Sequence, residues 1–322
     1  MPVIIQDDQA HLKSKLIKAG AIVLSGDEAI SQDIRPARIG LLNLMPAATM
    51  ESTELQWLRY ISDTVLQIEP VLMKFDDDFR ERSGASRENI LSRYQPFSDV
   101  AKMGLDGLIV TGGNLELSDS QEGEQKIGLD FDKLKFYDQL REIILWARSN
   151  VYSTIYSCIA SHFALNQLYG MNRTIMKNKI FGVFDHQVHD TLTSPFTKGI
   201  DDIIRAPHAR WGIIEMKEFE NTNVDILASN SEAGWLLAQN KNNIGGHDMF
   251  LQGHPEYDRY DLHREYQRDW AIGEAKGIPK GYYASNNPAS IPQLTWANDA
   301  RALHSNWIAS IFKHFSTDLL NL

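Results

Sequence analysis

The chain has 322 residues, 43% hydrophobic and 23% charged, enough to bury one large core or two small ones. A formal net charge of −10 disfavours binding to a nucleic-acid backbone, and no apolar run approaches the roughly 20 residues that cross a bilayer. The N-terminus lacks a secretory signal pattern, and the single cysteine excludes an intrachain disulfide and a multi-cysteine metal site. We therefore expect a cytoplasmic protein whose lone thiol stays reduced.

Short runs rich in β-branched residues alternate with longer stretches of helical period. The expected buried parallel strands, in chain order, are Arg38–Leu44, Leu66–Phe75, Gly107–Thr111, Val151–Ser157 and Met249–Gln252. The expected helices are Glu51–Ile61, Phe131–Ser149, Ile159–Tyr169, Tyr260–Gly277 and a final one near Ala300–Phe315. A short hairpin is expected from Asp225–Ser229 and Gly234–Gln239.

This alternation predicts an α/β fold with a three-layer sheet. No linker is long enough to separate two domains, so we expect one α/β catalytic domain over residues 38–278. An N-terminal arm over 1–37 precedes it, and a C-terminal extension over 279–322 packs on it. The polar stretch Ser118–Leu129 is expected to form a loop.

Cys158 lies where the strand VYSTIYS meets a segment of helical spacing. A side chain at such a junction is exposed on a tight turn, at the edge of the sheet where α/β folds bind ligands. The helix N-terminus favours a thiolate there, and its free N–H groups can stabilise an oxyanion. A lone cysteine is also often a small buried hydrophobe, so a second feature must support a catalytic role.

The second feature is the segment GHPEYD, in which His254 and Glu256 are two residues apart after an apolar strand. Alternate residues of extended backbone point to the same side, so the carboxylate can reach one imidazole nitrogen while the other faces a nucleophile. Pro255 stiffens the link. On its own the segment is also compatible with a surface turn. Taken together with Cys158, it predicts a Cys-His-Glu catalytic triad.

At these residues the chain resembles the homoserine O-acyltransferases of methionine biosynthesis, the branch with a class I glutamine amidotransferase-like fold. The matching stretches are DIRPARIGLLNLMP (33–46), DGLIVTGG (106–113), STIYSCIASHFALNQLYG (153–170), KIFGVFDH (179–186), APHARW (206–211), GHPEYD (253–258) and NNP…W…NW (286–307). They cover nearly the whole chain in the family's order. The resemblance implies a flavodoxin-like three-layer sheet.

The resemblance also implies a role for each matching residue. Cys158 takes the place of the family's acyl-thioester cysteine, with His254 as base and Glu256 as the acidic partner. The implied substrate-binding positions are Lys179, Arg268 and Ala209, and the implied oxyanion hole is formed by the backbone at Gly113 and Ile159.

The acyl donor is implied by Glu116, because in the family glycine there goes with succinyl-CoA and glutamate with acetyl-CoA. A carboxylate would repel the succinyl carboxylate but not an acetyl group. The resemblance thus implies ping-pong transfer of an acetyl group from acetyl-CoA to homoserine. It implies a homodimer with small-molecule substrates, no permanently bound cofactor, no metal, and no nucleic-acid or membrane partner.

The chain departs from the family pattern near the site. Ile159 and His162 replace tryptophan and glutamine, and Ala209 replaces a serine that assists acceptor choice. Ala47-Ala48 replaces a lysine, and Ser118–Leu129 is an apparent insertion. These departures leave serine or another amino alcohol as alternative acceptors. They also leave open a glutaminase-type hydrolase on the same fold and a non-catalytic binding protein.

Overall fold

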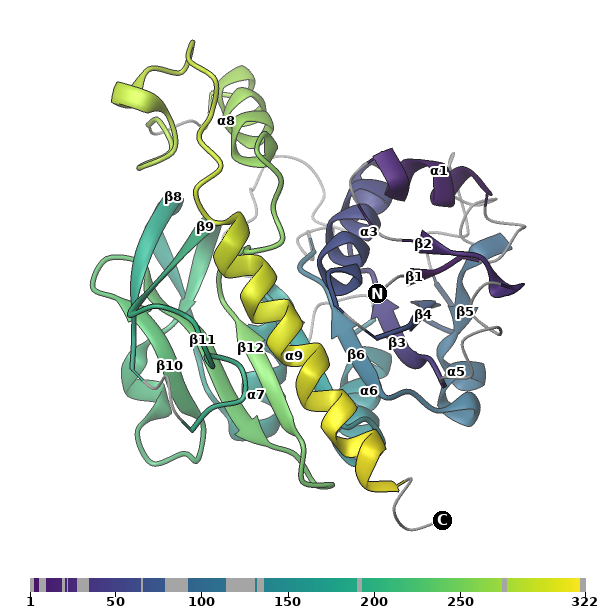
Figure 1. The fold of residues 1–322 in the computed structure, drawn as a ribbon. Helices are drawn as coiled ribbons and strands as arrows, with labels where there is room; N and C mark the ends of the chain where they lie inside the picture. Colours follow the sequence, from purple (N-terminus) through teal and green to yellow (C-terminus); the bar gives the residue numbers. More distant parts are fainter. Residues whose placement is uncertain are drawn as a thin grey trace.

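The computed structural model describes residues 3–5, 10–18, 21, 23–27, 35–64, 66–78, 92–113, 131, 136–189, 193–273 and 277–318. Within them one sheet runs through the molecule with helices on both sides (Figure 1). The strands are β1 (Val3–Ile4), β2 (Val23–Leu24), β3 (Ala37–Leu42), β4 (Ile68–Lys74), β5 (Gln95–Pro96), β6 (Gly107–Val110), β7 (Ser153–Ser157), β8 (Arg173–Val188), β9 (Ile203–Ile214), β10 (Asp225–Asn230), β11 (Gly234–Lys241) and β12 (His247–Leu251). The helices are α1 (Ala10–Lys18), α3 (Ala47–Ser62), α5 (Phe97–Met103), α6 (Tyr137–Asn150), α7 (Ile159–Tyr169), α8 (Asp261–Ala271) and α9 (Ala297–Asp318), with short 3₁₀ turns at Met216–Phe219 and Ala284–Asn286.

One half of the sheet contains a parallel run of five strands, in the order β4-β3-β6-β7-β12. These are the five strands expected from the sequence, and their order is that of flavodoxin-like folds. All five end at the same edge, so the segments that follow β3, β6, β7 and β12 meet there. The predicted α/β fold with a three-layer sheet is therefore confirmed.

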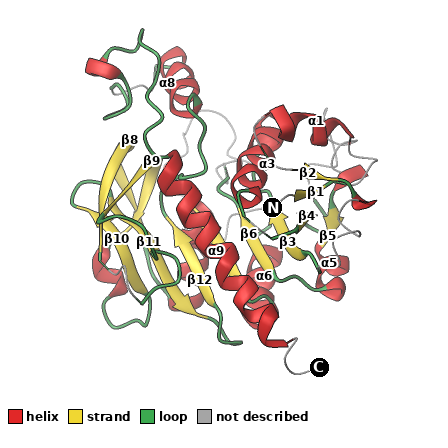
Figure 2. Ribbon diagram, in the orientation of Figure 1, coloured by secondary structure: helices red, strands yellow, loops and turns green. Residues whose placement is uncertain are grey.

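Helices lie on both sides of the parallel strands (Figure 2). Alternating side chains of these strands pack against the two helical layers. Ile109 of β6 contributes to a core shared with α1, α3 and α9, whereas its neighbours Leu108 and Val110 contribute to one shared with α5, α6 and α7. Both faces of these strands are buried, which explains their continuous apolar sequences.

The other half of the sheet is antiparallel, in the order β12-β11-β10-β8-β9. The expected hairpin is confirmed as β10 and β11. The long pair β8 and β9 was not expected, because each strand is buried on only part of its length and its sequence mixes polar with apolar residues. Together with β10 and β11 they extend the sheet by four strands beyond the parallel half.

The chain after β12 forms a smaller layer above the site. Leu262, Tyr282, Tyr283 and Trp296 pack on Val183 of β8 in a separate cluster. Gly182 permits this approach, because a Cβ there would lie 2.4 Å from the carbonyl oxygen of Lys280. α9 then crosses back over the sheet (Figure 1).

Several helix boundaries differ from the sequence-based ones. α6 begins at Tyr137 rather than Phe131, α8 spans only Asp261–Ala271, and α9 begins at Ala297. The expected loop Ser118–Leu129 lies outside the described residues.

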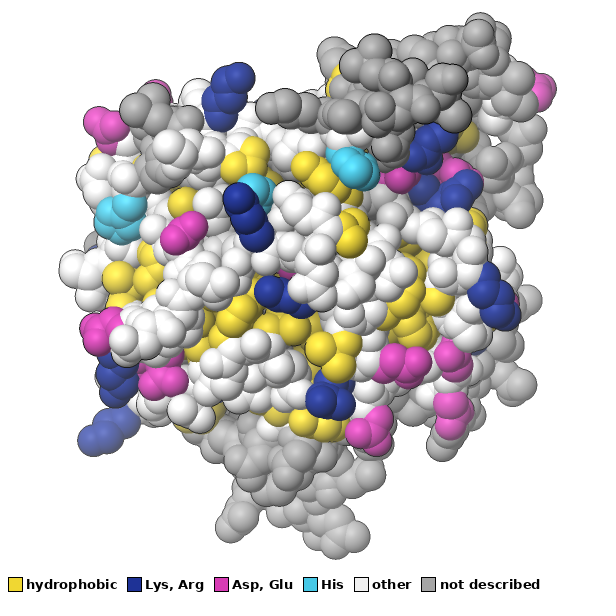
Figure 3. Space-filling model, turned by 90° about the horizontal axis from the view of Figure 1, so that it is seen from below, with side chains coloured by type: hydrophobic (Ala, Val, Ile, Leu, Met, Phe, Trp, Pro, Cys, Tyr) yellow, Lys and Arg dark blue, Asp and Glu magenta, His cyan; other side chains and the backbone are white. Residues whose placement is uncertain are grey.

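Surface charge is mixed rather than segregated on the face shown in Figure 3, where basic and acidic side chains alternate around apolar ones. Among the described helices none is long and apolar enough to cross a membrane. The described residues also contain no group of three or more His, Cys, Asp or Glu side chains placed to hold a metal ion.

Candidate active site

Cys158 occupies a sharp turn between β7 and α7. Its φ of 53° and ψ of −116° lie in a region that residues other than glycine rarely adopt. The turn is held by its own hydrogen bonds: the Cys158 N–H donates to Leu251 of β12 (2.7 Å), and its carbonyl oxygen accepts from the N–H (3.0 Å) and hydroxyl (2.6 Å) of Ser161. These hydrogen bonds hold Cys158 in its strained conformation. The turn leaves the thiol partly exposed at the edge of the sheet.

Gly112 allows Cys158 and His254 to approach each other. A Cβ at this position would lie 3.3 Å from both Cys158 Cβ and His254 Cε1. The thiol-bearing carbon and the imidazole therefore flank the same point after β6. A larger residue would press on both of them, which explains a glycine at the end of this strand.

His254 and Glu256 have the geometry that the sequence predicts. His254 Nδ1 is 2.8 Å from Glu256 Oε1, and both side chains are buried. The backbone is fixed by a 2.8 Å hydrogen bond from the His254 N–H to the carbonyl oxygen of Pro207 on β9. The carboxylate can thus hold the Nδ1–H tautomer and leave Nε2 for proton transfer.

The electrostatics favour a charged pair. Burial lowers the pKa of His254, but the attraction of Cys158 and Glu256, together with hydrogen bonds to both, outweighs it and raises the pKa well above its ordinary value. The raised pKa means that the His254 imidazole readily holds a proton beside the Cys158 thiol, as a proton-transfer partner of a nucleophile must.

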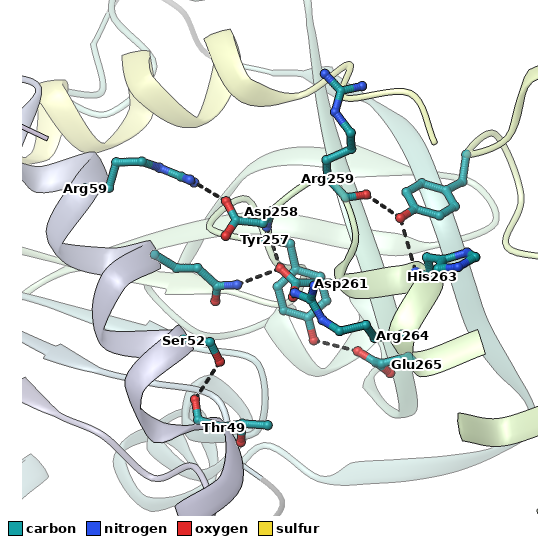
Figure 4. A network of polar contacts seen from close by, with 12 residues as sticks. Thr49, Ser52, Arg59, Tyr257, Asp258, Arg259, Asp261, His263, Arg264 and Glu265 are labelled. Carbon is teal, nitrogen blue, oxygen red and sulfur yellow. Dashed lines mark hydrogen bonds and ion pairs between the residues drawn. The ribbon is translucent and has the colours of Figure 1, made fainter. Parts of the chain in front are cut away.

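Tyr257 connects the base to the charged residues of α8. Its ring stacks on His254, and its hydroxyl donates to Glu265 (2.8 Å; Figure 4). Lys179 of β8 binds Glu265 (3.1 Å) and Asp269 (2.7 Å), and Arg268 binds Asp269 (2.8 Å). The structure therefore brings the two predicted substrate-binding cations together through two carboxylates. The two carboxylates, Glu265 and Asp269, were not predicted as site residues. They are four residues apart on α8, a spacing that places them on one face of the helix and could have indicated them.

The predicted oxyanion-hole groups lie at the same edge. The N–H of Ile159 is the first of α7, where helix N–H groups have no partner within the helix. Gly113 lies tight against Leu44, since a Cβ there would be 2.8 Å from the Leu44 carbonyl oxygen. Two backbone segments thus flank the thiol, one from β6 and one from α7.

A buried chain of hydrogen bonds runs through β8 and β9 beside the site. Arg210 Nε donates to His208 Nδ1 (3.2 Å), His208 Nε2 lies 3.1 Å from His186 Nε2, and His186 Nδ1 lies 3.3 Å from the carbonyl oxygen of Ile204. Guanidinium only donates and a carbonyl only accepts, so both histidines are neutral with fixed tautomers. Burial lowers the pKa of His186 to about 4 and that of Arg210 to about 10, while Cys158 opposes the change at Arg210.

Ala209 and His162, two of the positions that depart from the family pattern, are both at least partly buried. Ala209 is half-buried and packs with the cluster above the site. His162 is buried on α7, its Nε2 is 3.0 Å from Gln252 Oε1, and burial lowers its pKa well below the usual value. It is thus a packed helical histidine, bonded to Gln252. Glu116 lies outside the described residues, as do the side chains of Ala47 and Ala48.

Comparison with known sequences gives a consistent match over almost the entire chain. The model of the homoserine O-succinyltransferase family matches residues 2–316. A homoserine O-succinyltransferase of Pseudoalteromonas atlantica is 35% identical over 96% of this chain and 95% of its own. A homoserine O-acetyltransferase of Lachnospira eligens is 33% identical over 96% of this chain and 93% of its own.

Solved structures are similar at much lower identity. The crystal structure of SMU.1228c has a TM-score of 0.51 and 13% identity, over 85% of this chain and 99% of that one. A glutamine amidotransferase from Thermotoga maritima has a TM-score of 0.47 and 12% identity, over 87% of this chain and 98% of that one. At such identity the likeness to SMU.1228c is one of fold alone.

Proposed function

The chain belongs to the homoserine O-succinyltransferase family, and on that premise we propose that it transfers an acetyl group from acetyl-CoA to the hydroxyl of homoserine through a thioester on Cys158. The observation that carries the mechanism is the strained turn at Cys158, which faces an imidazole hydrogen-bonded to Glu256 at 2.8 Å. This arrangement supports an acyltransferase with a covalent intermediate.

In the first half-reaction the Cys158 thiolate attacks the thioester carbonyl of acetyl-CoA. A carbon–sulfur bond forms to Cys158, the bond to the CoA sulfur breaks, and the His254 imidazolium protonates the departing CoA thiolate. The N–H groups of Gly113 and Ile159 stabilise the tetrahedral oxyanion between these events.

In the second half-reaction neutral His254 takes the proton of the acceptor hydroxyl. The oxygen attacks the acetyl-enzyme, an oxygen–carbon bond forms, and the bond to Cys158 breaks. The thiolate and imidazolium are thereby restored. Glu256 keeps the imidazole oriented in both half-reactions and stabilises its charged form.

The acceptor binds to the charged cluster around α8. Arg268 has an exposed guanidinium that can receive the α-carboxylate of an amino acid, and Lys179 shares its carboxylate partner Asp269. Glu265 and Asp269 set the positions of both cations before the substrate arrives. Homoserine is the proposed acceptor, and serine is the alternative that Ala209 keeps open.

The acetyl donor is proposed from Glu116, whose charge would repel the carboxylate of a succinyl group. The relatives include enzymes named for each donor, so the donor is decided by experiment. The test is to incubate the protein with acetyl-CoA or succinyl-CoA without acceptor and to measure the intact mass. We expect one acetyl group on Cys158, none on Cys158→Ala, and little succinylation.

Addition of homoserine, serine or water to the isolated acyl-enzyme identifies the acceptor, and we expect homoserine to clear the adduct. The absence of both adduct and CoA release would refute the transferase. Ammonia release from glutamine would instead favour the glutaminase-type alternative on this fold.

A further inference from the structure

The proposed catalytic carboxylate and two side chains near it each bury a polar atom that has no hydrogen-bond partner within the described part of the chain. They are Oε2 of Glu256, Nε2 of His304 and Nε1 of Trp57. Glu256 is 3% exposed and the other two are fully buried. A buried polar atom without a hydrogen-bond partner destabilises the folded state, so all three atoms need a partner.

The three residues belong to one interface. Trp57 of α3 and His304 of α9 are in edge contact, with ring centroids 5.3 Å apart and an interplanar angle of 73°. Burial lowers the pKa of His304, and the Glu256 carboxylate acts in the opposite direction. The side chain of Glu256 is therefore close enough for its charge to act on the His304 ring.

The backbone on either side of this contact is fixed. Tyr257, next to Glu256, accepts a 2.9 Å hydrogen bond from the indole N–H of Trp296 at the start of α9. Asp258 forms an ion pair with Arg59 of α3 (Figure 4). The segment that carries Glu256 is thus clamped between α3 and α9.

The chemistry and the neighbours of the three atoms determine which of them donate and which accept hydrogen bonds. His304 Nδ1 is 2.6 Å from the carbonyl oxygen of Ala300, so it carries the ring proton and Nε2 presents a lone pair. The Trp57 indole only donates, and the Glu256 carboxylate only accepts. The interface therefore presents one donor and two acceptors.

A single water molecule matches this set. It accepts from Trp57 Nε1–H and donates one hydrogen to Glu256 Oε2 and the other to His304 Nε2. Buried waters typically make about three hydrogen bonds. An ammonium ion or a metal cation cannot accept from the indole, and a halide cannot donate to either acceptor.

We propose that one water is bound between Trp57, Glu256 and His304, and that it fixes the Glu256 carboxylate in the orientation that holds His254. Trp57 and His304 are then positioning residues that act through Glu256, without contact with substrate. The functional part of this inference rests on the roles proposed above for His254 and Glu256. The binding site for water does not.

The direct test is a crystal structure of the full chain at a resolution that shows ordered water. We expect one water within about 3.2 Å of all three atoms. Density without a water, or the three atoms beyond reach of a common point, would overturn the proposal.

The functional test compares two variants on α9. His304→Phe keeps an aromatic ring against Trp57 and Tyr60 but removes the acceptor. His314→Phe is the matched control, because His314 lies on the same helix and stacks on Tyr152 instead. For His304→Phe we expect a fall in kcat on the order of tenfold, the size found for the outer partners of metal-ligating histidines. The KM for acyl-CoA should stay unchanged.

A second measurement does not require the transferase reaction. The rate of Cys158 alkylation against pH reports the thiolate, and its midpoint should move to higher pH in His304→Phe but not in His314→Phe. Trp57→Phe should give the same shift, and it keeps the test valid if the first variant does not fold. His304→Gln restores an acceptor and should recover part of the effect.

The outcomes separate the two proposals. An unchanged alkylation profile and kcat in both His304→Phe and Trp57→Phe would refute the positioning role. A shifted profile in a protein that forms no acyl-enzyme would refute the proposed function and leave the water site standing.

Discussion

The ring of Tyr257 lies almost parallel to that of His254, with 4.3 Å between the centroids and 20° between the planes. The hydroxyl of the same side chain donates to Glu265, which binds Lys179. The ring of Tyr257 therefore packs on the proposed base, and its hydroxyl group binds a residue of the proposed acceptor site.

This double contact predicts that two substitutions of Tyr257 differ. Tyr257→Phe keeps the stack and removes one hydrogen bond, so the KM for the acceptor should rise about 2- to 10-fold with kcat nearly unchanged. Tyr257→Leu also removes the stack and should lower kcat. Steady-state kinetics with varied acceptor measure both, with Tyr266→Phe on α8 as control. Equal losses of kcat in the two variants would contradict this division.

Gly112 is expected to be sensitive because of its two neighbours. In Gly112→Ala the new methyl group lies 3.3 Å from both Cys158 Cβ and His254 Cε1, so the pair must move apart by a few tenths of an ångström. Small displacements of reacting groups cost up to about 100-fold in rate, and we expect a loss of kcat of about 10- to 100-fold with little change in thermal stability.

The control for this substitution is Gly104→Ala, which should show the reverse pattern. Gly104 has a φ of 77° and nothing within 4 Å of an added Cβ. Its φ of 77° and ψ of 152° lie in a region that is essentially restricted to glycine, so the replacement should cost about 1–3 kcal/mol of stability through backbone strain and leave kcat unchanged. A Gly112→Ala enzyme with normal kcat would show that the thiol and imidazole tolerate the displacement.

The chain from Arg210 through His208 to His186 predicts a difference between polar and apolar replacements. His186→Gln can accept from His208 and donate to Ile204, whereas His186→Leu leaves the His208 N–H without an acceptor. The leucine variant should lose about 1–3 kcal/mol of unfolding free energy, and the glutamine variant should lose less. Urea denaturation of both measures the difference. If glutamine were no better than leucine, the hydrogen-bonded chain would contribute nothing to stability.

Asp248 predicts how stability changes with pH. Burial on β12 raises its pKa from 3.8 to about 7, while Arg148 opposes the shift. The folded protein keeps this proton where the unfolded chain has lost it, so its contribution to stability is present below pH 3.8 and is lost as the pH rises through about 7. Such a shift corresponds to about 4 kcal/mol.

Asp248→Asn removes that dependence and keeps an acceptor for the N–H of Thr154. Urea denaturation should show a stability advantage of the variant that grows between pH 5 and pH 8. Asp99→Asn, at an exposed position on α5, serves as control. Parallel pH profiles for Asp248→Asn and the wild type would contradict a raised pKa.

The sequence predicts the parallel half of the fold well, because strands buried on both faces have continuous apolar runs that end in turns. It also predicts the positions of Cys158 and His254, since both follow such strands. The pair β8 and β9 could not be predicted in the same way. Neither has a continuous apolar run: residues 173–181 of β8 are exposed or half-buried, with a change of register inside the strand, and β9 mixes polar and apolar residues among its buried and half-buried positions.

The contacts behind the triad depend on tertiary structure. Tyr257 is adjacent to Glu256 in the sequence, but nothing local indicates that its ring covers His254. The link from Glu256 to His304 joins residues of two separate segments, and only the packing of α9 on α3 brings them near one another. Glu116 remains a prediction from the sequence alone.

The hydrogen bond from the Cys158 N–H to Leu251 ties the reactive turn to a strand nearly a hundred residues further along the chain. Before β7 and β12 pair, the thiol has no imidazole beside it and reacts with thioesters as any free cysteine does. In the proposed mechanism, acyl capture assisted by His254 is then confined to molecules in which the sheet is complete.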